Sequence, residues 1–187
     1  MNFVQIILCK DFMMKNEKVS KIVTVTAIER PARKLIILRA KNTKDGDYEA
    51  YWEEMNCDWE DYLNSISEKF APVALLTLPD NLVKPDTSNT ASGVEVPFDY
   101  SLAVKEGYEI IDLPPCTMLY FQGASYENGE DFNIAIDIVM QALENYDPNR
   151  YGFIYTPELA PKFNYGANEK MGALIAVPVQ ESDKPCY

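Results

Sequence analysis

Two segments of this sequence, lying 83 residues apart, follow the same pattern. Residues 25–40 read VTAIERPARKLIILRA, and residues 108–123 read YEIIDLPPCTMLYFQG. When Ile28 is aligned with Ile111, the offset is 111 − 28 = 83 and a proline falls on a proline. Each segment has two apolar runs on either side of the proline, which is typical of two strands joined by a sharp bend. The chain therefore contains one hairpin pattern twice, as a duplicated fold would.

The segments that follow the two hairpins repeat as well. Residues 48–66 and 132–146 carry apolar side chains at steps of three and four, which predicts an amphipathic helix in each half. Two strand candidates follow each helix, and they lie at 72–79 and 92–98 in the first half and at 151–156 and 171–179 in the second. Gly93 aligns with Gly172 at an offset of 172 − 93 = 79. Chance similarity explains any one segment, but four segments in the same order favour duplication.

This order of elements predicts the fold class and its boundaries. We expect an α+β fold in which two β-β-α-β-β units are related by a pseudo-two-fold axis. About eight strands would form an antiparallel sheet around a central cleft, with two long helices behind it. The predicted boundaries are an N-terminal extension at 1–20, a single domain at 21–180 with repeats at 21–104 and 105–180, and a C-terminal tail at 181–187.

Composition narrows the function classes. The net charge is 17 − 29 = −12, so we expect no nucleic-acid binding by this chain alone. The sequence has no His, which removes Ser-His-Asp catalysis and His-containing zinc sites, and we expect no metal or cofactor. Its four scattered cysteines suggest free thiols in a reducing cytoplasm. The apolar start at 3–9 is too short to span a membrane, and we interpret it as an extra strand or a loosely held extension.

Strand alternation singles out one carboxylate. In the segment SGVEVPF, Val94 and Val96 share one face of the strand and Glu95 takes the other. The valines would pack against the helices, so Glu95 would face the cleft. A buried carboxylate needs partners, which we expect to be tyrosine hydroxyls or the ligand. The alternative is that Glu95 is simply solvated on an open sheet face.

Aromatic residues are the second candidate component of a site. The chain has twelve Tyr, eight Phe and two Trp, and many fall on predicted strands or helix starts. Rings together with a carboxylate favour an organic cation or a flat amphipathic molecule. The predicted ligand-binding residues are Glu95, Tyr51, Trp52, Tyr120, Tyr155 and Tyr165. Aromatic residues on the helix stripe, such as Trp59, have core packing as their alternative role.

These motifs together resemble the GyrI-like, or AraC effector-binding, domain. The resemblance rests on the two hairpins, on NCDW at 56–59 and on the SGVEVPFDY strand, and it covers residues 21–180. It implies a duplicated scaffold whose central cleft binds hydrophobic or cationic small molecules. Family members include ligand-sensing halves of transcription regulators, gyrase-inhibitory proteins and some hydrolases of strained cyclopropane compounds. Many relatives carry a second Glu in the last strand, where Leu174 or Ile175 stands in this sequence.

Three functions follow from these features. We expect a small-molecule-binding domain, either the effector sensor of a transcription regulator with multidrug binding or a stand-alone ligand-sequestering protein. The alternative is a GyrI-like hydrolase in which Glu95 activates water and Tyr120 or Tyr155 donates a proton. The third is a role for the acidic surface in binding a protein partner, although acidic surfaces more often serve solubility.

Overall fold

The strands of this chain form antiparallel pairs, and helices pack on them, so the α+β class is confirmed. The computed structural model describes residues 5–8, 19–43, 47–55 and 58–182. By contacts, the chain divides into two compact units that interleave along the sequence. Unit 1 comprises residues 1–29, 117–155 and 164–187, and unit 2 comprises residues 30–116 and 156–163.

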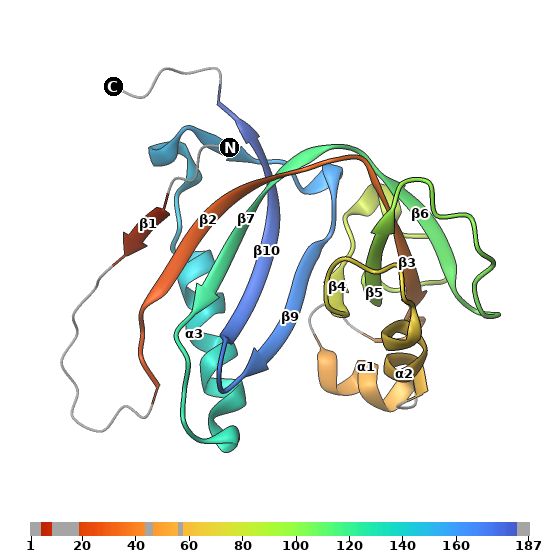
Figure 1. The fold of residues 1–187 in the computed structure, drawn as a ribbon, viewed down its shortest axis with the longest axis horizontal. Helices are drawn as coiled ribbons and strands as arrows, with labels where there is room; N and C mark the ends of the chain where they lie inside the picture. Colours follow the sequence, from red (N-terminus) through yellow and green to blue (C-terminus); the bar gives the residue numbers. More distant parts are fainter. Residues whose placement is uncertain (1–4, 9–18, 44–46, 56–57, 183–187) are drawn as a thin grey trace. The chain divides into compact units, whose positions relative to one another are not determined.

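Unit 1 is a sheet covered on one face by a helix (Figure 1). Its strands follow the order β1-β2-β7-β10-β9, and β8 pairs with the end of β10. The strands are β1 Gln5–Leu8, β2 Val23–Arg30, β7 Cys116–Gly123, β8 Phe153–Tyr155, β9 Lys162–Asn168 and β10 Gly172–Glu181. The helix α3 spans Phe132–Glu144 and buries Ala135 and Val139 against the sheet. The strand expected near the N-terminus is present as β1.

Alternation explains which residues of unit 1 form its core. On β7, Leu119 and Phe121 are buried beneath α3, and Tyr120 between them points to the other face. On β10, the odd-numbered apolar residues from Ala173 to Val179 join the same core. The two strands pair with Ala176 opposite Tyr120. In the described part of unit 1, α3 therefore covers one face of the sheet, and Tyr120 lies on the other face.

Unit 2 is likewise a sheet with helices packed on one face, and its four strands follow the order β4-β5-β3-β6. Its strands are β3 Arg33–Arg39, β4 Ala74–Thr77, β5 Thr90–Pro97 and β6 Glu109–Leu113, and its helices are α1 Tyr48–Met55 and α2 Asp58–Ser65. Tyr51 and Leu63, one from each helix, pack with Ile36, Val94 and Val96. These contacts bury the even-numbered face of β3 and β5 beneath the helices.

Short 3-10 helices complete the set of elements. They span Asp80–Leu82, Gly129–Asp131, Pro148–Tyr151 and Pro157–Leu159. The last two begin at a proline, which suits the first position of a helical turn because its missing N–H has no partner there anyway. No helix in the described ranges is long and apolar enough to cross a membrane.

The structure corrects the predicted number of elements. One of the two expected long helices is instead the pair α1 and α2, each eight residues long, which flank residues 56–57 outside the described part. The described chain has ten strands rather than about eight, because β1 and β9 join the other eight. Each half does contain strands, a helical region and further strands in the predicted order. The duplication and its pseudo-two-fold axis stay predictions.

A carboxylate on α1 holds the end of β3 in place and makes the stability of unit 2 pH-dependent. Glu54 accepts hydrogen bonds from the backbone N–H groups of Lys41 at 2.7 Å, Asn42 at 3.0 Å and Thr43 at 2.9 Å. Burial alone would raise the pKa of Glu54, but these donors bring the pKa below its ordinary value. The contribution to stability is therefore present above the unfolded pKa and is lost as pH falls through the folded pKa.

We expect Glu54→Gln to lower the free energy of unfolding by about 1.5–3 kcal/mol at pH 7, the range for hydrogen bonds to a charged group. At pH 3 the difference from wild type should be smaller, because the wild-type carboxylate becomes protonated as the pH falls through its lowered pKa. Urea unfolding of both proteins at the two pH values measures this. The exposed neighbour Glu53 provides the control, since Glu53→Gln should have no effect at either pH. An undiminished difference at pH 3 would contradict the prediction.

Candidate functional site

Glu95 lies in β5 on the face of the strand away from the helices of unit 2. Its neighbours Val94 and Val96 belong to the core beneath α1 and α2, as strand alternation predicted. The Glu95 side chain is only 2% exposed, so the interpretation of a solvated residue is wrong. Its position in a cleft between repeats stays a prediction. A buried carboxylate is costly unless it is paired, so the groups that bind Glu95 determine what it can do.

Two arginines, rather than tyrosine hydroxyls, satisfy the Glu95 carboxylate. Arg33 Nε donates to Glu95 Oε1, and Arg30 Nη2 donates to Oε2 at 2.8 Å. The Arg33 side chain is 1% exposed and the Arg30 side chain is 15% exposed. Strand register explains the first contact, because Leu35 pairs with Glu95 and Arg33 lies two residues before it on the same face. Glu95 is therefore a buried, doubly paired carboxylate.

Arg33 connects this pair to both of the repeated hairpins. Its Nη1 atom donates to the carbonyl oxygens of Pro31 at 3.3 Å and Pro114 at 3.2 Å, the two prolines that align in the repeat. The same nitrogen lies 3.7 Å from Cys116 Sγ. Burial disfavours the charged guanidinium, but the charge of Glu95 raises the pKa of Arg33 above its ordinary value. Arg33 stays charged and joins the bends of the two hairpins.

An exposed ring lies beside the second arginine. The Cζ atom of Arg30 lies 5.1 Å from the centroid of the Phe70 ring, in the geometry of a cation–π contact. The backbone N–H of Phe70 donates to the Glu95 carbonyl at 3.2 Å, which positions the ring next to the ion pairs. Phe70 is 45% exposed. We call Arg30, Arg33, Glu95 and Phe70 the arginine cluster.

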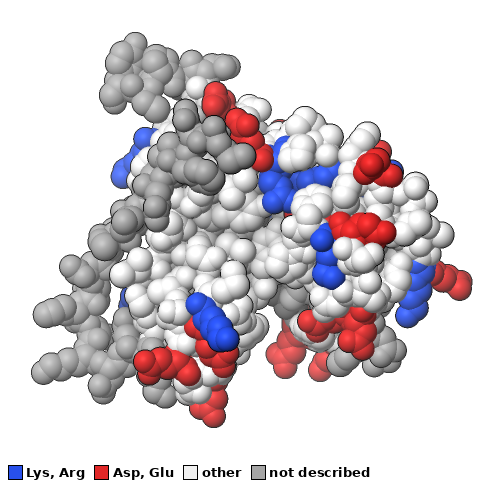
Figure 2. Space-filling model, in the orientation of Figure 1, with Lys and Arg blue, Asp and Glu red and all other residues white. Residues whose placement is uncertain are grey.

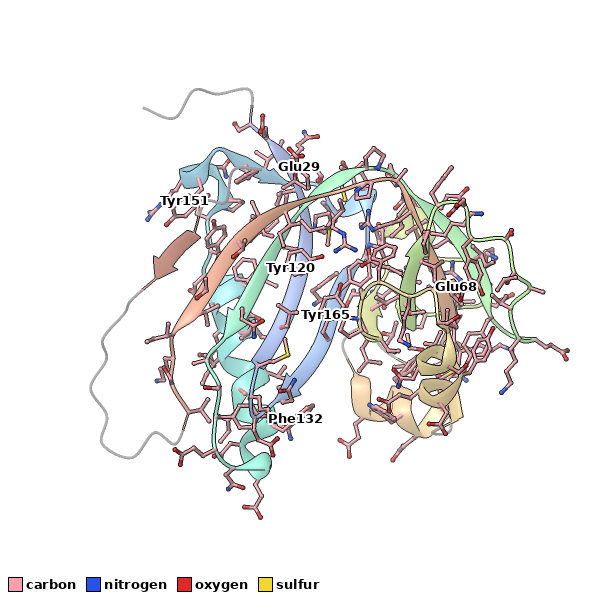
Figure 3. All side chains as sticks on the ribbon, viewed as in Figure 1. Glu29, Glu68, Tyr120, Phe132, Tyr151 and Tyr165 are labelled. Atoms are coloured by element: carbon pink, nitrogen blue, oxygen red, sulfur yellow. The ribbon has the colours of Figure 1, made fainter. Side chains whose placement is uncertain are left out.

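In unit 1 two tyrosines from different strands form a ring pair. Tyr120 on β7 and Tyr165 on β9 have ring centroids 6.5 Å apart and an angle of 15° between their planes. Both are half-buried and point from the sheet face away from α3 (Figure 3). Gly166 follows Tyr165 with a φ of +72°, a conformation that glycine adopts without strain. Both tyrosines were predicted to bind the ligand, and the structure brings their rings together.

The surroundings of this tyrosine pair are apolar. Strand β10 lies between β7 and β9, and Ala176 pairs with Tyr120. The small Ala176 side chain is fully buried and leaves room for a large ring beside it. The space-filling view shows mostly uncharged residues over these strands (Figure 2). An uncharged face with two nearly parallel rings suits a flat or lipophilic molecule.

The other three predicted aromatic residues have different environments. Tyr51 is buried in the core of unit 2 with Val94 and Val96, on the face of β5 opposite Glu95, and its hydroxyl bonds with Ser92 Oγ at 2.7 Å. The structure therefore does not bring Tyr51 to Glu95. Trp52 is exposed on α1.

Tyr155 is exposed on β8 of unit 1, and its hydroxyl donates to the Tyr146 carbonyl at 3.5 Å. Partial burial and, to a smaller extent, the charge of Asp147 raise the pKa of Tyr155 to about 12. A phenol with this pKa releases a proton less readily than an ordinary tyrosine. Tyr155 is therefore poorly matched to the proton-donor role of the hydrolase alternative.

Sequence reasoning missed Arg30, Arg33 and Phe70. Arg33 begins the second strand of the first hairpin, so its place in a strand could be predicted. Its ion-pair partner Glu95 could not, because Glu95 lies in a distant segment. A signal existed in the alternation of β3, which places Arg33 and Leu35 on the face opposite Ile36. Only the pairing of β3 with β5 shows that Arg33 and Leu35 lie on the same face of the sheet as Glu95.

Comparison with solved structures identifies the fold. SAV2435 bound to tetraphenylphosphonium aligns over 83% of this chain and 93% of its own, with 15% identity and a TM-score of 0.54. EcmrR in its DNA complex aligns over 85% of this chain and 58% of its own, with 11% identity and a TM-score of 0.47. The EcmrR C-terminal domain aligns over 85% of this chain and 98% of its own, with 11% identity and a TM-score of 0.45.

The likeness to SAV2435 shows that the two proteins share a fold. No protein-family model and no curated protein matches this sequence. This likeness in fold agrees with the resemblance of the sequence motifs to the GyrI-like domain.

Proposed function

We propose that this chain is a small-molecule-binding domain whose ligand stacks against Tyr120 and Tyr165. The observation that carries the proposal is the pair of nearly parallel rings, 6.5 Å apart, on the sheet face opposite the one that α3 covers. This separation lies at the wide end of the range in which stacked rings attract, about 4.5–7 Å. The two rings therefore gain more from contact with a flat group than they gain from each other.

The chemistry of the tyrosine pair indicates the class of ligand. Tyrosine rings present large apolar faces with partial negative charge, so they bind aromatic molecules and also organic cations. SAV2435, which shares the fold, is bound to tetraphenylphosphonium in its structure. We infer a hydrophobic or aromatic ligand, with lipophilic cations included, and a biological role as an effector sensor or as a ligand-sequestering protein.

The hydrolase alternative has less support. Its general base would be Glu95, but both carboxylate oxygens accept hydrogen bonds from guanidinium groups, which compete with water for them. Ligand binding requires only the tyrosine pair, so we propose binding without catalysis.

We expect tetraphenylphosphonium to bind the wild-type protein, and Tyr120→Ala or Tyr165→Ala to weaken binding by about 1–2 kcal/mol, roughly 5- to 30-fold. Each substitution removes one stacking face and leaves the core beneath α3 intact. Isothermal titration calorimetry measures the affinity, and a rise in melting temperature with ligand confirms it independently.

A matched control for this experiment exists in unit 2. Tyr62 and Tyr108 form a second tyrosine pair, with centroids 4.4 Å apart and planes inclined by 55°. Tyr108→Ala should leave tetraphenylphosphonium affinity unchanged, because these rings are in close mutual contact. Equal affinities of wild type, Tyr120→Ala and Tyr165→Ala would overturn the proposed site. A wild type that binds none of a panel of cationic, neutral and anionic aromatic compounds would overturn the proposed function.

A further inference from the structure

The sheets of the two units follow the same strand order, but unit 1 has one strand more at its edge. Unit 1 contains the order β9-β10-β7-β2-β1, and unit 2 contains the order β4-β5-β3-β6. The alignment of Ile28 with Ile111 matches β2 with β6 as well. Beside β2 lies β1, which pairs with it in antiparallel orientation. In the described part of unit 2, no strand lies at the corresponding edge of β6 (Figure 1).

The backbone of β6 can form hydrogen bonds to a further strand. β6, Glu109–Leu113, pairs with β3 alone among the described strands, in a register without a bulge. Every second residue of an antiparallel strand turns its N–H and C=O groups away from its partner, so an edge strand offers these groups to another chain. Lysine, proline and bulges often protect such edges. The sequence EIIDL of β6 contains neither lysine nor proline, so these protections are missing.

The side chains of β6 determine which strand can pair with it. Ile110 and Ile111 lie in its middle, with Glu109 before them and Asp112 after them. Asp112 is exposed, and the Glu109 side chain is 29% exposed. Opposite charges directly across two strands attract each other and like charges repel, whereas apolar residues pack on apolar ones. A matching strand therefore carries two apolar residues opposite the isoleucines and a basic residue on either side of them.

A second copy of this chain does not suit this edge. In the antiparallel register that pairs all five residues of two β6 strands, Asp112 would lie opposite Ile110, and Glu109 would lie opposite Leu113. The carboxylates of each copy would therefore meet apolar side chains and no cation. Each chain also carries a net charge of −12, so two copies would repel each other. A basic segment of another protein meets neither obstacle.

We propose that the outer edge of β6 binds an extended segment of a partner protein, in which a basic residue, two apolar residues and a second basic residue follow one another. The segment would pair antiparallel with β6 and add a fifth strand to the sheet of unit 2, as β1 does in unit 1. Main-chain hydrogen bonds would supply most of the affinity, and Asp112 would select the basic residue opposite it. The net charge of −12 would also speed the approach of a basic segment.

Three synthetic peptides of equal length test the pairing on the wild-type protein. They are the basic SKFVKITS, the acidic SEFVEITS and SKPPKITS, in which prolines remove both central N–H groups, and each has blocked ends. Each is titrated while backbone amide signals are followed by NMR. We expect SKFVKITS to shift the signals of Glu109–Leu113 and to bind at least ten-fold more tightly than either of the other peptides. Equal affinity of SEFVEITS or of SKPPKITS, or no shift with SKFVKITS, would overturn the proposal.

A charge reversal in β6 then locates the selection. We expect Asp112→Lys to reverse the preference, so that SEFVEITS binds more tightly than SKFVKITS, because a positive charge would then lie opposite the incoming side chain. The matched control is Glu60→Lys, which changes the net charge by the same amount at an exposed position of α2 and should keep the preference for SKFVKITS. If the two variants alter the preference equally, it reflects the net charge of the chain, and pairing beside Asp112 is refuted.

Sedimentation equilibrium tests the other possible occupant of the edge. A dimer of the wild-type protein that SKFVKITS dissociates would assign the edge to a second copy and would overturn the proposed partner. A mass that SKFVKITS does not lower agrees with the proposal. Neither measurement uses tetraphenylphosphonium, so failure of the small-molecule proposal and failure of this one are observed separately.

Discussion

Replacing Glu95 by Gln is expected to lower the free energy of unfolding by about 3–5 kcal/mol, the cost of leaving a buried charge without its partner. Glutamine keeps the shape of the side chain but removes the negative charge beside Arg33, which is itself 1% exposed. The Arg33 guanidinium then remains in the interior, bonded to Pro31 and Pro114 carbonyls but uncompensated. Urea unfolding at pH 7 measures the loss.

Two companion variants show whether buried charge is the cause. Glu109→Gln removes a carboxylate that also pairs with two cations, Arg39 and Lys84, but the Glu109 side chain is 29% exposed and the Lys84 side chain is 56% exposed. We expect that variant to cost less than Glu95→Gln, because water hydrates Glu109 and Lys84 and only Arg39, at 5% exposed, is buried. The double variant Glu95→Leu with Arg33→Met removes both charges and should recover most of the lost stability. A loss below 1 kcal/mol in Glu95→Gln would show that water reaches Arg33.

The second large effect is expected at Gly172, where β10 begins. Its φ is +75°, a conformation that costs a residue with a Cβ about 1–2 kcal/mol. A Cβ atom there would also lie 2.8 Å from the Ala124 carbonyl carbon and collide with the carbonyl oxygens of Gly123 and Ala124. Backbone atoms cannot move aside as a side chain can, and such overpacking costs roughly 1–3 kcal/mol more. We expect Gly172→Ala to destabilise the protein by about 3 kcal/mol in total.

A substitution at Gly107 separates the cost of a positive φ from the cost of the collision with backbone atoms. Its φ is +89°, but the nearest atom to a new Cβ, Leu38 Cδ1, lies 4.0 Å away. Gly107→Ala should therefore cost only the conformational part, about 1–2 kcal/mol. Thermal unfolding of both variants measures the difference. If the two variants lose equal stability, the collision with the 123–124 backbone contributes nothing and the prediction for Gly172 is wrong.

The hairpins were predictable because their signals are local. In both copies a proline bend separates two alternating apolar runs, and the structure has strands at Val23–Arg30, Arg33–Arg39, Glu109–Leu113 and Cys116–Gly123. Strand β9 was missed, because its sequence KFNYGAN contains polar residues and a glycine with positive φ. Its place in the sheet comes from pairing with its neighbours, and pairing leaves no periodic signal in such a short segment.

The candidate sites divide in the same way. Alternation was enough to place Glu95 on the face opposite Val94 and Val96, and the structure agrees. In the structure, alternation likewise turns Tyr120 to the face opposite Leu119 and Phe121 in β7. It could not place Tyr51, because a core aromatic residue and a ligand-binding one have the same spacing on a helix.

By itself the sequence determined the α+β class, the hairpins and the face of β5 on which Glu95 lies, because these depend on residues that are close together along the chain. Only the tertiary structure decided what surrounds Glu95, since Arg33 and Arg30 lie 62 and 65 residues away along the chain. The pairing of Tyr120 with Tyr165 likewise depends on the order of β7, β10 and β9. The physical reason is register: alternation says which way a side chain points, but the partner is set by which distant strand lies beside it.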